Sequence, residues 1–555
     1  MRFSARSKVG GLLSLVAIIT IISAFMLNGL FFHATATHAA SGQAYSATKG
    51  ILTPSKSIDD SNSTPTLFSK GARHYQQKNT QVGVSPSATS SQTGSGNTGT
   101  LLQKFKGTSS LDSAKTNFGA EFEPPDQGLC VGNGFVVEPV NSAYNIYRTN
   151  GTKIAGPFNV NRLFSDGFKQ FTSDPRCYFD KSTNTWFAII LFINSKGTRA
   201  RTDLAVNTSG DPTTPWTDYR IDATDDGTNG TPNHPGCPCL GDQPLLGIDQ
   251  QNVYISTNEF SILGTAFNGA QIYAISKSQL VALSNSVNFV HFDNLSIGGA
   301  VATSVQPAIT NGEPNAEYFM NSLDPNGTFD NRVGVWAMTN RDAVTQGKFP
   351  TLSSLVITSE PYGIPPKAIQ KGATSKLDSG DDRMQQVQYI NGNLWGELTT
   401  GVTIPNDPAQ RAGAAWFKVQ PQLDTSGSQI KAAKLANQGY VVSSGNYLIY
   451  PAIQASPNGT AAIVMTLSGS NFFPSVVYTK LQQNGNAFGV IHSALNGTGP
   501  YSLTSTRWGD YSWAVLDPDT NNFWMATEYI PPVSSQTLDG LQNWGTGVIE
   551  VSAKS

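Results

Sequence analysis

Short apolar segments, separated by turns rich in Asp, Asn and Gly, recur along the chain from about residue 120 onward. The repeated unit is a hairpin: an apolar strand, a polar turn and a second strand that opens on an aromatic or aliphatic residue. Successive starts lie 48 to 77 residues apart, so residues beyond the roughly 40 to 50 of a compact propeller repeat are expected in loops. The seven hairpins begin at Asp126, Asp174, Asp242, Gln306, Arg383, Tyr450 and Arg507.

A third apolar strand follows each hairpin, for example over residues 204–207, and a fourth follows in six of the seven repeats, for example over residues 216–221. Four antiparallel strands per repeat, without helical periodicity between them, are typical of a propeller blade. The sequence therefore predicts an all-β fold, a seven-bladed β-propeller of four-stranded antiparallel blades over residues 108–555. A sandwich and a parallel β-helix are the structural alternatives.

The seventh repeat lacks a fourth strand, because the chain ends soon after the apolar stretch at 544–551. An unpaired strand edge invites association with other chains. We therefore expect residues between 101 and 119 to supply the missing strand and close the ring.

The N-terminal region is of a different kind. Arg2, Arg6 and Lys8 precede an uncharged apolar run over 9–32, and small residues follow, which predicts a signal peptide over 1–40. An uncleaved membrane anchor formed by 9–32 is the alternative, and both place the body outside the cytoplasm. Residues 41–107 are rich in Ser, Thr, Gly, Gln and Asn, which predicts a disordered linker.

Composition narrows the range of partners. Charged residues make up 13% of the chain, Gly numbers 53 and the net charge is -2. This profile fits a turn-rich β protein, and without a basic excess neither nucleic acid nor an anionic membrane surface is expected as a partner. The body is expected to be a monomer that contacts a membrane only through an uncleaved N-terminal segment.

Three segments together resemble a group of uncharacterised exported bacterial propellers, which are related at fold level to the sialidase and BNR-repeat superfamily. They are LDSGDDRMQQVQYINGNLW at 377–395, RWGDYSWAVLDPDTNNFWMATEY at 507–529 and WGTGVIEVS at 544–552. The Asp-box of sialidases is echoed at 456–460 and 517–524, whereas the Arg-Ile-Pro signature that opens a sialidase is absent. The resemblance covers most of residues 120–552 and implies a scaffold rather than a chemistry.

Polar residues stand where the first strand of several repeats begins. In a propeller these strands line the axis, so such side chains converge at one mouth of the channel, where they could orient a sugar or hold a cation. Ion pairing between neighbouring blades would use the same residues. The ligand-binding candidates are Asp126, Asp174, Arg176, Asp242, Asp382, Arg383, Arg507 and Asp510.

Glutamates fall within the second strand of four repeats, at Glu138, Glu259, Glu397 and Glu528. A glycoside hydrolase would need two carboxylates about 5 to 9 Å apart, a distance that sequence cannot supply. No catalytic residue is assigned from the sequence.

Metal binding is not expected from the sequence, and calcium is the one ion that could be a cofactor. Oxygen ligands alternate at Asp180, Ser182 and Asn184 and again at Asp517, Asp519 and Asn521, but turn-forming Asp and Asn give the same pattern. The acidic loop of Asp222, Asp225 and Asp226 shares this ambiguity. His234, Cys237 and Cys239 lie close enough to suggest a metal site, although an exported location favours oxidation of the cysteines.

The four cysteines are expected to form two disulfides. Cys130 and Cys177 occupy matching places in adjacent repeats, and a bond between Cys237 and Cys239 would close a very small loop. Each cysteine of the Cys-Pro-Cys loop is therefore predicted to bond Cys130 or Cys177, with the pairing left open.

These features favour a secreted or surface protein that recognises a glycan or cell-wall polymer at the channel mouth. An enzyme of glycoside hydrolase or lyase type that uses the same face is one alternative, and a structural surface protein is another.

Overall fold

Antiparallel β-strands account for almost all of the regular structure in the computed structural model of the chain. The structure describes residue 45 and residues 47–55, 99–119, 122–323, 329–502, 507–532 and 543–554, all within the unit His38–Ser555. The predicted signal peptide or anchor lies outside the described residues. Within the described ranges, no helix is long and apolar enough to cross a membrane. The helices among these described residues are α2 (Ser110–Thr116), α3 (Lys277–Val281) and the 3-10 turns η1 (Val160–Phe164) and η2 (Arg341–Ala343).

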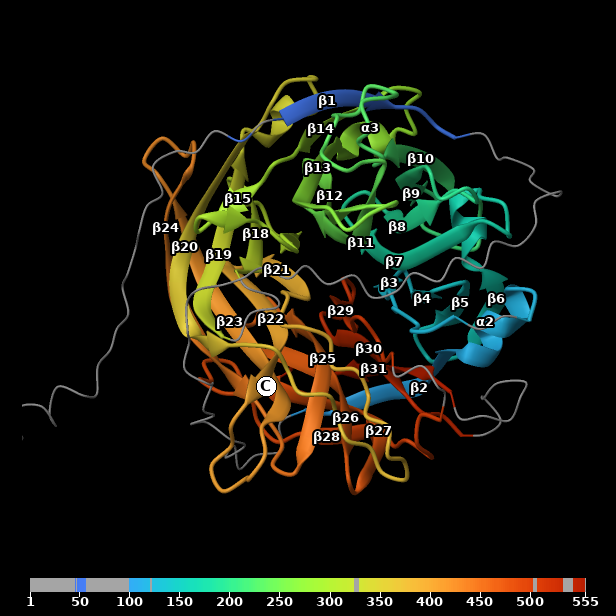
Figure 1. The fold of residues 1–555 in the computed structure, drawn as a ribbon, viewed down its shortest axis with the longest axis vertical. Coiled ribbons are helices and arrows are strands. Elements are labelled where there is room, and N and C mark those ends of the chain that lie inside the picture. The colour runs from blue at the N-terminus through green and yellow to red at the C-terminus, as the bar shows by residue number, and fades with distance from the viewer. Residues whose placement is uncertain are drawn as a thin grey trace, which may run out of the picture. The chain divides into compact units, whose positions relative to one another are not determined.

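The strands follow one another in antiparallel sets of four (Figure 1). Set 1 is β3 (Cys130–Gly132), β4 (Phe135–Val140), β5 (Ala143–Arg148) and β6 (Lys153–Asn159). Set 2 is β7 (Phe171–Asp180), β8 (Thr185–Ile193), β9 (Ala200–Asn207) and β10 (Thr217–Asp222). Set 3 is β11 (Cys239–Ile248), β12 (Asn252–Ser261), β13 (Phe267–Ser276) and β14 (Val287–Phe292).

The later sets repeat the pattern. Set 4 is β17 (Gln306–Asn311), β18 (Glu317–Ser322), β19 (Asp330–Thr339) and β20 (Thr351–Tyr362). Set 5 is β21 (Gln386–Ile390), β22 (Asn393–Val402), β23 (Arg411–Leu423) and β24 (Ile430–Val441). Set 6 is β25 (Asn446–Ala455), β26 (Ala461–Gly469), β27 (Phe472–Leu481) and β28 (His492–Leu495). A small ribbon of β15 (Ser296–Ile297) and β16 (Ala300–Val301) precedes set 4.

Set 7 takes its fourth strand from the beginning of the body. It contains β29 (Trp513–Leu516), β30 (Phe523–Tyr529) and β31 (Gly545–Val551), and β2 (Leu101–Ser109) pairs antiparallel with β31. The expectation that residues between 101 and 119 supply this strand is confirmed.

Neighbouring sets are held together by contacts between their faces. Parallel pairing joins the first strands β11, β17 and β21 of sets 3, 4 and 5. Apolar side chains fill the space between sheets, and one such cluster joins Val131 and Tyr147 of set 1 to Trp513 and Trp524 of set 7. The last set therefore packs against the first, and each fully buried aliphatic or aromatic side chain contributes about 1.5 to 3 kcal/mol to that packing.

The first strands bend where polar residues lie. Asp174 at φ 61°, Gln243 at 49° and Tyr450 at 49° adopt the left-handed backbone region, and the strand register shifts at each of these places. Such a shift is a β-bulge, which turns the strand and re-aims its side chains. The recurrence of one bulge explains why residues far apart in sequence reach a common place.

Part of the predicted linker is a strand. β1 (Ala47–Leu52) pairs along β14, and Ser55 continues onto set 2 by donating its backbone N–H to Asp218. Tyr45 packs against Trp336 of set 4 with ring centroids 5.3 Å apart. We call Tyr45 and residues 47–55 the N-terminal strap. The linker prediction is wrong for these residues and for residues 101–107 of β2, because backbone pairing at an open edge needs no apolar alternation in the added strand.

The predicted disulfide pairing is wrong. Cys130 bonds Cys177, with Cα atoms 5.5 Å apart, and Cys237 bonds Cys239, with Cα atoms 4.4 Å apart. Cys130 and Cys177 stand on adjacent first strands and share one buried cluster, so they face each other. The Cys-Pro-Cys turn brings its own two cysteines within bonding distance, which the prediction had dismissed.

Candidate functional site

Seven of the eight predicted ligand-binding residues come together where the first strands begin. Arg176 interacts electrostatically with Asp174, Asp126 and Asp510. Arg507 does so with Asp510 and Asp126, and Arg383 with Asp242 and Asp510. The group thus joins sets 1, 2, 3, 5 and 7. We call it the mouth cluster, formed by Asp126, Asp174, Arg176, Asp242, Arg383, Arg507 and Asp510.

Asp382 is the exception. It is fully buried, and its charge adds to burial in raising the pKa of Tyr362 of set 4. The neighbouring Asp381 takes the expected role, since its Oδ2 atom lies 2.5 Å from Nη2 of Arg383. The sequence analysis named Asp382 in place of Asp381. Only one of two adjacent side chains can face the cluster, and the sequence does not show which.

Arg176 occupies the buried centre of the mouth cluster. It has no exposed surface, and none of its three guanidinium nitrogens has a hydrogen-bond partner among the described residues. Its guanidinium carbon lies 3.1 Å from the ring centroid of Tyr511 and 4.4 Å from that of Trp513. Burial lowers the pKa of Arg176, and the flanking rings offset part of its lost hydration through cation–π attraction.

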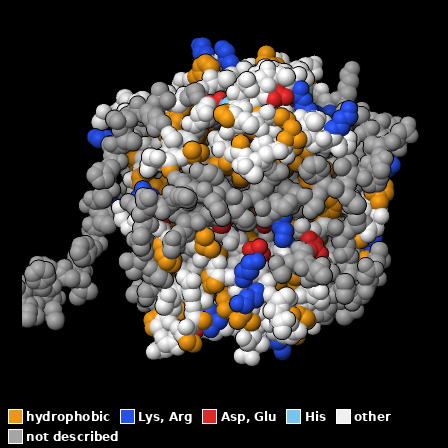
Figure 2. Space-filling view, viewed as in Figure 1, with side chains coloured by type: hydrophobic (Ala, Val, Ile, Leu, Met, Phe, Trp, Pro, Cys, Tyr) orange, Lys and Arg blue, Asp and Glu red, His pale blue; other side chains and the backbone are white. Residues whose placement is uncertain are grey.

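Other members of the mouth cluster are paired within it. Asn141 donates to Asp126 Oδ2 at 2.8 Å and accepts from the backbone N–H of Asp174 at 2.8 Å. Arg507 pairs with Asp510 at the solvent side, where the side chains are 21% and 35% exposed. Figure 2 shows acidic and basic side chains side by side near the centre of this face. The cluster is therefore a network of internal ion pairs with a narrow exposed rim.

The four strand glutamates are all buried and do not form one group. Glu138 lies between strands, where its carboxylate accepts from Thr108 N at 2.7 Å and from the Thr546 hydroxyl, and burial raises its pKa to about 7. Burial also raises the pKa of Glu397 and Glu528 well above the ordinary range. Glu259 instead accepts from Gln271 at 2.9 Å and contacts His234. None of the four is more than 2% exposed.

The alternating turns predicted as calcium candidates are closed by their own hydrogen bonds. Asp180 accepts from Ser182 and Thr183 and pairs with Lys277 at 2.9 Å. Asp517 accepts from Thr520 at 2.7 Å and from the Asp519 N–H at 2.9 Å. These are the bonds of ordinary Asx turns.

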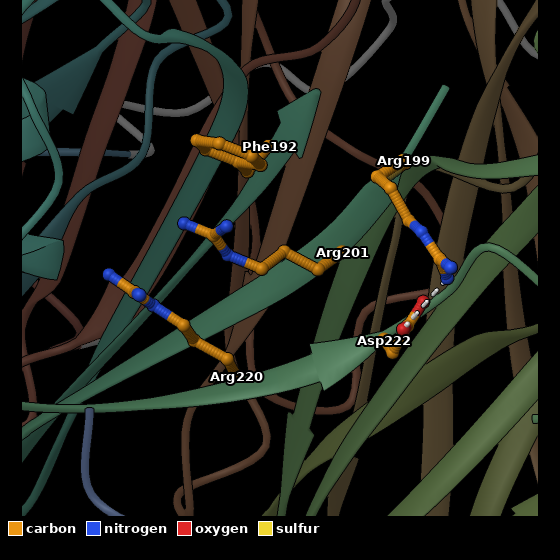
Figure 3. Close-up of a pocket in the computed structure, with 6 residues that line it drawn as sticks. Phe192, Arg199, Arg201, Arg220 and Asp222 are labelled. Atoms are coloured by element: carbon orange, nitrogen blue, oxygen red, sulfur yellow. Dashed lines mark ion pairs between the residues drawn. The ribbon is translucent and has the colours of Figure 1, made fainter. Parts of the chain in front are cut away.

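A pocket of about 300 Å³ lies on set 2 and was not foreseen. We call it the arginine pocket, lined by Phe192, Arg199, Ala200, Arg201, Arg220 and Asp222 (Figure 3).

Strand register explains the position of the arginine pocket. Thr172, Phe192, Arg201 and Asp222 stand opposite one another in a single row across the four strands. That row lies two residues before Asp174 along β7. The arginine pocket therefore opens at the same end of the sheet as the mouth cluster.

Guanidinium groups and carboxylates alternate in and beneath the pocket. Arg201 lies 3.4 Å from the ring centroid of Phe192 (Figure 3). Arg201 and Arg220 both donate to Asp166, at 2.6 and 2.9 Å. Arg199 Nη1 has no hydrogen-bond partner among the described residues, and it lies 3.6 Å from Asp222 Oδ2.

The carboxyl groups below the pocket lie close enough together to affect one another's pKa. Burial, followed by repulsion from Asp203, raises the pKa of Asp218 to about 9 and holds that of Asp166 well above its ordinary value. Arg201 also pairs with Asp203 at 2.6 Å. The floor of the pocket is therefore a compact set of hydrogen-bonding groups in which Asp203 faces both Arg201 and Arg220.

Comparisons with known proteins give weak structural likenesses. No protein family matches the chain, and no curated protein does. A GH93 α-L-arabinofuranosidase of Fusarium graminearum shares 11% identity over 80% of this chain and 98% of its own, with a TM-score of 0.34. The phage phi92 endosialidase shares 8% over 68% of this chain and 66% of its own, with a TM-score of 0.35. A mutant Trypanosoma rangeli sialidase shares 10% over 74% and 57%, with a TM-score of 0.32. At these scores no conclusion about this chain rests on them.

Proposed function

We propose that this protein is an exported seven-bladed propeller that binds a neutral sugar unit of a glycan in the arginine pocket. The seven strand sets, the pairing of β2 with β31 and the packing of set 7 on set 1 support the closed ring. Two disulfides fit an oxidising, extracellular location.

The observation that carries the proposal is the arginine pocket itself. Its volume of about 300 Å³ falls at the lower end of the range for small-molecule sites. The Arg199 side chain, 38% exposed, offers guanidinium donors, and the Asp222 side chain, 28% exposed, offers acceptor oxygens. Donors and acceptors at fixed spacing around an aromatic wall suit a ring that carries several hydroxyl groups.

The charge balance of the arginine pocket favours a neutral ligand. Arg199 pairs with Asp222 and Asp226, and both Arg201 and Arg220 lie against Asp203. An anionic sugar would have to compete with these carboxylates for the same guanidinium groups. The electrostatic field of the pocket therefore gives no advantage to a negative charge.

Burial of the strand glutamates favours binding over hydrolysis. A glycoside hydrolase must bring two carboxyl groups to the scissile bond, on opposite sides of the sugar. Glu138, Glu259, Glu397 and Glu528 are enclosed by the sheets. In the mouth cluster, Asp126 and Asp174 are buried as well, and Asp510 is paired with Arg507.

The test is a binding screen of the secreted chain against neutral pentose and hexose oligosaccharides and against acidic ones that carry uronate or sialate. We expect a neutral oligosaccharide to bind, and Arg199→Ala and Asp222→Asn each to weaken it about tenfold, or about 1.4 kcal/mol. Lys196→Ala is the matched control, since Lys196 is exposed on the same β8–β9 connection but does not line the pocket.

Two outcomes would contradict the proposal. One is affinity that falls with Arg507→Ala but not with Arg199→Ala, which would place the ligand at the mouth cluster. The other is release of sugar from a polysaccharide by the wild-type chain, lost in Glu528→Gln, which would make the protein a hydrolase.

A further inference from the structure

A second buried polar group lies in set 3 and is used neither by the arginine pocket nor by the mouth cluster. Asp225 and His234 belong to the loop between β10 and β11, and Glu259 belongs to β12. Their exposed fractions are 1%, 8% and 1%. His234 Nδ1 lies 2.7 Å from Glu259 Oε2 and 3.9 Å from Asp225 Oδ2. We call these three residues the His234 cluster.

Asp225 is the residue of the cluster that most strongly indicates a bound ligand. Neither of its carboxylate oxygens has a hydrogen-bond partner among the described residues, although the side chain is almost wholly buried. A carboxylate buried in this way loses its hydration without any replacement, which costs several kcal/mol. A cation between Asp225 and its neighbours would supply the missing interaction.

The spacing of the His234 cluster suits one metal ion. One donor atom from each residue lies within 4.8 Å of the donors of the other two. A metal with bonds of about 2.0 to 2.2 Å could bridge the three after a small movement of the side chains. One imidazole nitrogen with two carboxylates is a donor set for zinc, whereas calcium takes six to eight oxygen ligands.

The surroundings of the cluster match those of a metal-bound histidine. If Nδ1 of His234 binds the metal, Nε2 faces Asp293 Oδ2 at 3.4 Å. A ligating histidine ordinarily presents its second nitrogen to a carboxylate in this manner. Glu259 is oriented in turn by Gln271, which donates to Oε2 at 2.9 Å, and Gln271 Oε1 lies 2.9 Å from His291 Nε2.

The adjacent disulfide limits the ligand set to nitrogen and oxygen. Cys237 Sγ lies 3.1 Å from Glu259 Oε1, but Cys237 and Cys239 are bonded to each other. Sulfur binds zinc as a thiolate, so the oxidised pair does not compete for the metal. The disulfide instead fixes the loop that carries His234 beside β12.

From this geometry we propose that Asp225, His234 and Glu259 bind one zinc ion. The full secreted chain, purified without reductant and freed of metal by a chelator, is titrated with zinc chloride in a calorimeter. We expect one zinc per chain with a dissociation constant below about 10 μM, and binding at least tenfold weaker in Asp225→Asn and in Glu259→Gln. Asp226→Asn is the matched control, because the neighbouring carboxylate faces Arg199, 3.6 Å away.

Thermal unfolding of each metal-free variant shows whether it is folded. Asp225→Asn is the milder variant, since no hydrogen bond to its carboxylate is lost. At the same zinc concentration, zinc should raise the melting temperature of the wild type by mass action and raise that of Asp225→Asn by less. X-ray absorption of the zinc-loaded wild type should show nitrogen and oxygen ligands.

Three results would overturn the assignment. The first is that the wild-type protein binds no zinc at 100-fold excess, which would leave His234 as an ion-pair partner only. The second is equal zinc binding by all three variants, and the third is sulfur in the coordination shell at about 2.3 Å.

Discussion

Glu138 is a buried residue that contacts the ring-closing strands, and its protonation makes the stability of the protein depend on pH. Its carboxylate accepts from Thr108 of β2 and from Thr546 of β31, while its own backbone lies in β4. Burial raises its pKa from 4.5 to about 7. The folded protein therefore holds this proton more tightly than the unfolded chain does.

The sign of the pH effect follows from that difference. For an acid with a raised folded pKa, the stability is fully present below the unfolded pKa of about 4.5 and is lost as pH rises through about 7. A shift of this size corresponds to a loss on the order of 3 kcal/mol across the window. Glu138→Gln should remove that slope in denaturant unfolding measured from pH 4.5 to 8. Glu313→Gln, an exposed surface change, should keep it. An unchanged slope in Glu138→Gln would show that other groups carry the effect.

The sequence also contains a pattern of charged residues that indicates the arginine pocket, although this pattern was not used to predict it. Arg199, just before β9, and Arg201 and Asp203 within it alternate along the chain, so a period of two places these charges on one face of the sheet. Charged residues are rarely buried unless they are paired, so such a face predicts an ion network. The partners Asp166 of Arg201 and Asp222 of Arg199 come from other elements, and sequence order does not bring them together.

Among the elements, the two disulfides differ in what they constrain. The Cys130–Cys177 bond spans 47 residues and joins sets 1 and 2, whereas the Cys237–Cys239 bond spans only two. In the chain-entropy model the longer loop contributes about 4 kcal/mol and the shorter one less than half of that.

Replacing both members of each pair by Ala should therefore lower the melting temperature much more for Cys130 and Cys177 than for Cys237 and Cys239. Differential scanning calorimetry measures the two shifts, and mass mapping of a non-reduced digest checks the pairing itself. Equal losses, or a peptide that links Cys237 to Cys130, would contradict this pairing.

Two neighbouring residues of the N-terminal strap, Leu52 and Ile51, differ in burial, so one can be tested with the other as its control. Leu52 is 4% exposed and packs into the cluster between sets 2 and 3, while Ile51 beside it is 62% exposed. Leu52→Ala should cost about 2 to 4 kcal/mol in unfolding free energy, because it leaves a cavity, and Ile51→Ala should cost less than about 0.5. Equal effects in chemical denaturation would show that the strap does not belong to the folded body.

For the whole molecule, the sequence predicted the repeated strands and the origin of the strand that completes set 7. Apolar segments and turn residues are local signals, and all seven hairpins show them. It also named most of the mouth cluster, because each member stands at the same place in its own repeat. The strap and the Cys130–Cys177 bond depend on which sheets become neighbours, and no local pattern carries that information.

Binding of a sugar in the arginine pocket on set 2 can be observed directly. The measurement is a crystal structure of the body soaked with the neutral oligosaccharide that binds most tightly. We expect a sugar ring among Phe192, Arg199, Arg220 and Asp222, with hydrogen bonds to Arg199 and Asp222. A sugar bound instead at the mouth cluster, with its glycosidic oxygen beside Glu528 or Asp510, would contradict it.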